Sequence, residues 1–178
     1  MRNVILSGGA ALILWVMPAY SQSSIAEKSG VNATLGVTPT TQDFITLAGN
    51  SDMLEIQSSQ LATAKADEKD KAFAERMIKD HTETSKKMRA LVDSGKVKAK
   101  LPATMDSAHQ AKLDKLKKLS GKDFSEHYED MQVAAHKDAV SLFQRYAKGG
   151  DNADLKAFAN ETLPALQEHL KMAQELEK

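Results

Sequence analysis

Apolar residues recur every three or four positions along four long stretches of this chain, all of them beyond residue 39. A helix turns once in 3.6 residues, so this spacing places the apolar residues on one helical face. The stretches run from Thr40 or Thr41 to about Ala66, from about Glu68 to Ser94, from Ser120 or Asp123 to Lys148, and from about Asn152 to the C-terminus. We predict four long helices, each with an apolar stripe to bury.

The lengths of the connections indicate how these helices pair. The turn between the first two helices is short, which favours an antiparallel hairpin, and the last two helices are also close in sequence. The segment from Lys96 to Ser120 is long enough to cross the length of a bundle and contains a short basic helix. The predicted fold is all-α, a ferritin-like four-helix bundle of two antiparallel hairpins with a long crossover containing a short helix.

A short internal repeat supports two related hairpins. Lys71-Ala72-Phe73-Ala74 recurs as Lys156-Ala157-Phe158-Ala159. A histidine follows each copy on the same helical face, eight residues after the phenylalanine in one case and eleven in the other. The two halves of the domain should therefore resemble each other.

The first 39 residues have a different pattern. A basic start precedes a mostly apolar stretch from Val4 to Val16, and Ala19-Tyr20-Ser21 offers the small residues that a signal peptidase requires. We predict a signal peptide over residues 1–21, a flexible lead-in over residues 22–39 and the helical domain over residues 40–178. The apolar stretch is short for a bilayer span and no second one follows, so we expect no transmembrane anchor. The expected location is the periplasm or the exterior.

Composition narrows the function classes. The chain has no cysteine, which excludes disulfides, thiolate metal sites and cysteine nucleophiles. It has 24 basic and 24 acidic residues, which are interspersed, so no field of one sign attracts nucleic acid. Nucleic acid is therefore not an expected partner.

Four polar residues lie within the apolar stripes: Glu55, His81, His136 and His169. Burial of a carboxylate or imidazole costs free energy unless the group is hydrogen-bonded, ion-paired or coordinated. Glu55 and His81 lie at similar distances from the turn that joins their helices, which places them at one level. We predict that the four share a polar site inside the bundle and together bind a metal ion or small ligand.

Pro164 falls within the stripe of the last helix, five residues before His169. Proline lacks a backbone N–H and clashes with the preceding turn. We expect it to kink the helix or to start a second segment, and the level of His169 depends on which occurs.

Several short motifs resemble a known family. They are Lys79-Asp80-His81, Leu119-Ser120-Gly121 with Phe124, Gln132-Val133 before His136, and Leu155-Lys156-Ala157-Phe158-Ala159 leading to Leu163-Pro164 and His169-Leu170. On these motifs the chain, from about Asp43 to Glu177, resembles the exported family catalogued as domain of unknown function 4142, whose members are commonly labelled predicted outer membrane proteins. The resemblance implies export and a ferritin-like bundle, and it implies no particular activity.

The residues around the histidines bear on the chemistry. Ferritin-like di-iron enzymes use Glu-x-x-His on two helices, but here Ile78 and Leu166 stand three residues before His81 and His169. We therefore expect not a di-iron oxidase but one transition metal ion, such as Zn, Fe, Mn or Cu, held by imidazoles and a carboxylate without turnover. The alternative is a non-enzymatic structural or stress-protection protein of the envelope, in which the same residues form a purely structural polar core.

Overall fold

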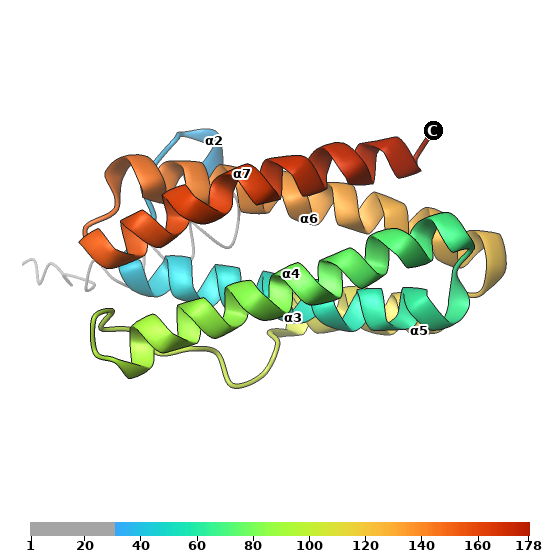
Figure 1. Cartoon of the computed structure of the whole chain (residues 1–178), viewed down its shortest axis with the longest axis horizontal. Helices are drawn as coiled ribbons and strands as arrows, with labels where there is room; N and C mark the ends of the chain where they lie inside the picture. Colours follow the sequence, from blue (N-terminus) through green and yellow to red (C-terminus); the bar gives the residue numbers. More distant parts are fainter. Residues whose placement is uncertain (1–30) are drawn as a thin grey trace, which may run out of the picture.

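Four long helices lie side by side in the computed structural model, which describes residues 31–178 (Figure 1). They are α3 (Thr41–Lys65), α4 (Glu68–Asp93), α6 (Gly121–Gly149) and α7 (Ala153–Leu176), and two shorter helices are α2 (Val31–Thr34) and α5 (Ser107–Lys117). No strand occurs among these residues, which confirms the all-α class. Within the same range, no helix is long and apolar enough to cross a membrane.

The helices begin where polar side chains can satisfy their first backbone N–H groups. Thr40, Asp67 and Asn152 each accept a hydrogen bond from the backbone nitrogen three residues later, at 3.0–3.1 Å for the first two. Such caps contribute about 1 kcal/mol each. The four predicted long helices are confirmed, with ends within about two residues of the expected ones.

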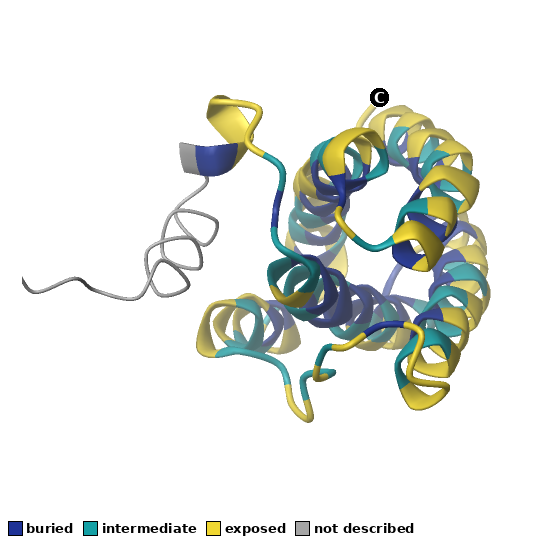
Figure 2. Cartoon of the chain, turned by 90° about the vertical axis from the view of Figure 1, so that its left-hand side faces the viewer, coloured by how far each residue is buried: buried dark blue, intermediate teal, exposed yellow. Residues whose placement is uncertain are grey.

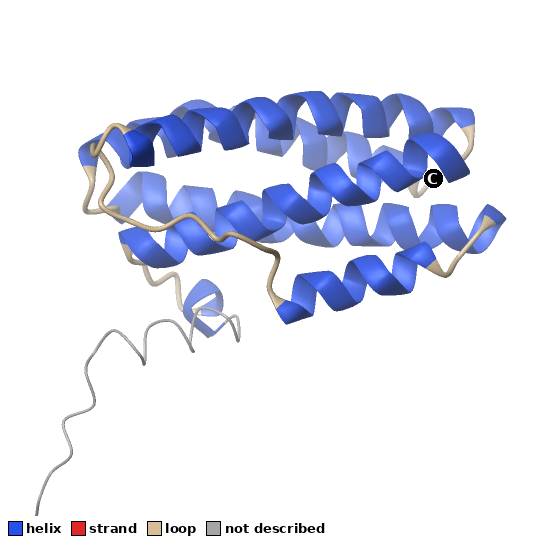
Figure 3. Cartoon of the chain, turned by 90° about the horizontal axis from the view of Figure 1, so that it is seen from below, coloured by secondary structure: helices blue, strands red, loops and turns tan. Residues whose placement is uncertain are grey.

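The helices form two antiparallel hairpins, α3 with α4 and α6 with α7 (Figures 1 and 3). α3 also packs on α6, and α4 packs on α7. The connection from α4 runs back along the bundle to α5, which packs on α3 and α6 (Figure 3). This is the predicted pairing of helices, whereas the relation to ferritin-like proteins remains an expectation.

The crossover lies close against α3. The side-chain amide of Gln42 donates to the backbone oxygen of Lys100 at 2.9 Å and accepts from its backbone nitrogen at 2.9 Å. A Cβ at Gly49 would lie 2.8 Å from the Pro102 ring, so this contact requires glycine. The crossover is therefore attached to the first hairpin.

α7 continues through Pro164 as one helix from Ala153 to Leu176. Of the two alternatives expected at Pro164, the start of a second segment is therefore wrong, and a kink stays a prediction. Leu166 and Ala173 beyond the proline are both buried in the core, and their burial outweighs the loss of one backbone hydrogen bond. His169 consequently stays on the inner face.

The predicted signal peptide lies outside the described residues, as does the lead-in up to residue 30. The rest of the lead-in contains α2, a turn at Leu35 and Gly36, and then a segment without regular secondary structure. Arg145 donates to the backbone oxygen of Val37 at 2.6 Å, which connects this segment to α6.

Buried residues lie on the inward sides of the helices (Figure 2). The apolar ones form two clusters. One is centred on Phe44, Phe143 and Tyr146 near the start of α3, and the other includes Phe73 and Phe124 near its end. Along α6 and α7 each histidine falls where one cluster gives way to the other. The three histidines therefore lie in the middle of the bundle, between two apolar clusters.

Candidate metal centre

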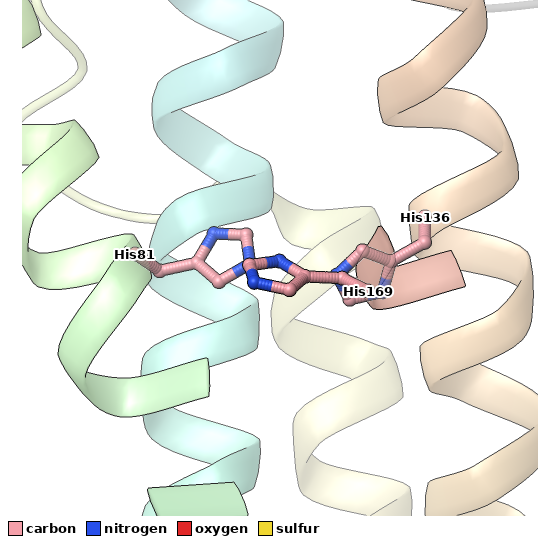
Figure 4. A group of neighbouring side chains, drawn as sticks. All are labelled: His81, His136 and His169. Atoms are coloured by element: carbon pink, nitrogen blue, oxygen red, sulfur yellow. The ribbon is translucent and has the colours of Figure 1, made fainter. Parts of the chain in front are cut away.

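Three histidines from three helices meet in the middle of the bundle (Figure 4). His81 comes from α4, His136 from α6 and His169 from α7, and none is more than 3% exposed. Their ring centroids are 5.4–5.5 Å apart. One ring nitrogen of each lies within 4.8 Å of the other two, so the three can share a single small ligand.

Carboxylates hold two of these rings from outside the cluster. Nδ1 of His81 lies 2.8 Å from Oδ1 of Asp52, and the other oxygen of Asp52 accepts from the Ser85 hydroxyl at 2.7 Å. Nε2 of His169 lies 3.0 Å from Oδ2 of Asp80. Because an ionised carboxylate only accepts, each of these ring nitrogens donates its proton outward.

The third ring is held by the backbone of its own helix. Nδ1 of His136 donates to the backbone oxygen of Gln132 at 2.9 Å. The remaining nitrogens are Nε2 of His81, Nε2 of His136 and Nδ1 of His169, and none has a hydrogen-bond partner within the described part of the chain. Three buried ring nitrogens thus face inward without a partner, and an outward hydrogen bond fixes each ring, as metal-binding histidines require. A metal ion would bind them in their deprotonated form.

Burial and neighbouring charges shift the pKa values of all three histidines. Burial lowers the pKa of His136 to about 3, with a further contribution from repulsion by His81. Burial also lowers the pKa of His169. Burial opposes the charged form of His81 too, but the hydrogen bond and charge of Asp52 outweigh it and raise its pKa. Two of the three imidazoles are therefore neutral near pH 7, which is the form that binds metals.

Glu55, the fourth predicted residue, lies beside this cluster. It is buried, and its Oε1 is 3.9 Å from Nδ1 of His136, the nitrogen on the outer side of that ring. Its Oε2 has no hydrogen-bond partner among residues 31–178, and burial raises its pKa to about 7. The structure thus brings three of the four residues into one group, and coordination by Glu55 stays a prediction.

The dimensions of the cluster suit a transition metal. A triangle with sides of 4.8 Å has its centre about 2.8 Å from each corner, whereas metal–imidazole bonds are about 2.0–2.1 Å long. Each ring would have to move inward by less than about 1 Å to coordinate one ion. Side-chain rotation can supply such a movement without displacing a helix.

The residues that orient the imidazoles were not predicted from the sequence. Asp52 lies three residues before Glu55 on α3, so the same helical face could have indicated it. Asp80 directly precedes His81 but bonds to His169 on another helix, and sequence periodicity carries no signal for that contact.

Comparisons with known proteins place the whole helical domain in one family. The family model described as "Domain of unknown function (DUF4142)" matches residues 26–176. No curated protein and no solved structure matches the chain.

Proposed function

The chain belongs to the DUF4142 family of domains of unknown function, and we propose that this member binds one transition metal ion through His81, His136 and His169. The inner nitrogens of these residues are the observation that carries the proposal, because all three are buried, close together and without hydrogen-bond partners. Leaving a buried polar atom unsatisfied costs about 1–3 kcal/mol. A single cation would satisfy all three.

The donor set selects the class of metal. Imidazole nitrogen suits Zn²⁺, Cu²⁺ and Fe²⁺, whereas Mn²⁺ prefers carboxylates. The general order of affinity places Cu²⁺ and Zn²⁺ above Fe²⁺ and Mn²⁺ for a site of this kind. We therefore propose Zn²⁺ or Cu²⁺ as the ion, with the outward hydrogen bonds of Asp52 and Asp80 orienting the ligands.

The burial of the centre favours holding an ion over catalytic turnover. Two surface hollows lie beside α5, and none of the three histidines lines either of them. The rings themselves are nearly inaccessible to solvent. A substrate would need an open coordination position that it can reach, so a bound ion here would stabilise the fold or be stored.

Titration of the chelator-treated protein with Zn²⁺ tests this proposal. We expect one ion per chain by calorimetry and a higher melting temperature, because an ion that binds only the folded state at about a thousand times its Kd adds about 4 kcal/mol to the free energy of unfolding. His127→Ala, on α6 but outside the cluster, should bind equally well. If neither Zn²⁺, Cu²⁺, Fe²⁺ nor Mn²⁺ binds, the proposal fails and the polar core has a structural role.

We also propose that the protein acts after export. The support is the sequence of residues 1–21, with its basic start, apolar stretch and small residues before Gln22. Protein recovered from the envelope of a Gram-negative host should therefore begin at Gln22 by mass spectrometry. Full-length protein that starts at Met1 and stays with the cytoplasmic fraction would refute export.

A further inference from the structure

Each histidine of the cluster is held by one hydrogen-bonding group on its outer side, which we call its tether. The three tethers differ in their access to solvent. The Asp52 side chain, which holds His81, is 7% exposed, and the carbonyl that holds His136 belongs to α6 itself. The Asp80 side chain, which holds His169, is 22% exposed. Of the two carboxylates that hold histidine rings, the one that holds His169 is therefore the more exposed.

Asp80 is held in turn by a group on that surface. Its Oδ2, the oxygen that binds His169, also accepts from Nε of Arg76, which is 43% exposed. The guanidinium of Arg76 on α4 also lies 3.8 Å from the carboxylate of Glu168 on α7. A chain of charged groups therefore links the inside of the cluster to the outer rim between α4 and α7.

The two hairpins meet along two junctions, α3 with α6 and α4 with α7. The junction between α4 and α7 is the easier one to open. α5 packs on both α3 and α6, so it covers the junction between those two helices (Figure 3). Of the described helices, none packs in the same way across α4 and α7, which are also not connected to each other in sequence (Figure 2). Hairpins that are held together along α3 and α6 can separate most readily along α4 and α7.

We propose that the ion reaches and leaves its centre through the seam between α4 and α7, and that Arg76 and Asp80 keep this route closed by holding His169 in place. This inference rests on the proposed metal binding. His81 lies on one side of the seam and His169 on the other. A bound ion would join the two hairpins across it, while rotation of His169 toward the rim would release the ion.

The kinetics of metal exchange distinguish this role from a purely orienting one. Arg76→Gln removes the outer tether without altering any ligand, so Zn²⁺ uptake and release should both become about tenfold faster while Kd changes less than threefold. Asp52→Asn weakens the orientation of His81 inside the core. In this variant Zn²⁺ release should become faster while Zn²⁺ uptake stays unchanged. Stopped-flow capture of Zn²⁺ by a chromogenic chelator measures release, and direct mixing measures uptake.

A cross-link across the seam provides the second test. The chain has no cysteine, so a cleavable bismaleimide can join Arg76→Cys to Glu168→Cys specifically. Linking should slow Zn²⁺ exchange at least tenfold relative to the same protein after cleavage. The matched control is Glu83→Cys with Lys87→Cys, an exposed pair one turn apart on α4, where linking should change nothing.

The outcomes separate this inference from the proposed function. A wild-type protein that binds no metal at equilibrium refutes both. A wild-type protein that binds Zn²⁺, but whose exchange rate is the same with the seam linked or free, refutes the α4–α7 route alone. Asp70 is a buried carboxylate near the start of α4. If Asp70→Asn accelerates Zn²⁺ exchange and Arg76→Gln does not, the route lies at that end of the bundle and the proposed route is refuted.

Discussion

Replacing His136 with alanine should lower the affinity for Zn²⁺ at least about a hundredfold, because even the loss of an outward hydrogen bond to a metal ligand costs 10–100-fold. His136 is fully buried, and its ring is 5.4–5.5 Å from each of the other two histidine rings. Because this site is closed to solvent, a water molecule cannot readily replace the missing imidazole as a ligand. Competition with a chromogenic chelator measures the affinity.

Two controls make this result interpretable. His127→Ala removes a histidine from the same helix, nine residues earlier, and should leave the affinity unchanged. His136→Gln keeps most of the side-chain volume, so it should fold even if the alanine variant folds poorly. It lacks the imidazole, so it should still lose metal binding. Wild-type affinity in a folded His136→Gln protein would show that the three histidines do not act together as a metal centre.

Replacing Glu55 with glutamine should stabilise the metal-free protein at high pH and not at low pH. Burial raises the pKa of Glu55 from 4.5 to about 7, so the folded state binds one more proton than the unfolded state between these values. The stability contributed by the protonated form is complete below pH 4.5 and is lost as the pH rises through 7. At 1.36 kcal/mol per pH unit, this loss is about 3 kcal/mol.

The variant does not have this loss, because glutamine stays neutral. The free energy of unfolding of each protein can be measured with urea in the presence of chelator. The difference, variant minus wild type, should increase by about 3 kcal/mol between pH 4.5 and pH 8. Burial and repulsion by the other histidines lower the pKa of His136, and these causes are present in both proteins. The charge of Glu55 also raises the pKa of His81, so the measured difference includes this coupling. The exposed substitution Glu75→Gln should show no such gain, and a parallel pH profile for Glu55→Gln would contradict the argument.

The same variant tests whether Glu55 coordinates the metal, as the sequence predicted, or lies outside the group of ligands. Glu55 faces the outer nitrogen of His136 and is not part of the group of three. We therefore expect Glu55→Gln to retain Zn²⁺ affinity within about tenfold. A loss as large as that of His136→Gln would make Glu55 a fourth ligand.

The sequence by itself determined the helices and the inner faces of the bundle. Apolar spacing and capping residues such as Thr40 and Asp67 are local properties, so the helix limits could be predicted closely. The same spacing identified His81, His136 and His169 as core residues, because a residue's position around a helix follows from its number. Pro164 was predicted less well, since the core contacts that keep α7 continuous are not local.

Only the tertiary structure decided which buried groups meet. Periodicity specifies the face of each helix but not its axial offset or rotation against its neighbours, and those are set by side-chain packing across the bundle. For that reason the bonds from Asp52 to His81 and from Asp80 to His169, and the position of Glu55 behind His136, were not evident from the sequence. These contacts join residues 29–89 positions apart, and the two hydrogen bonds among them orient the rings of His81 and His169 toward His136.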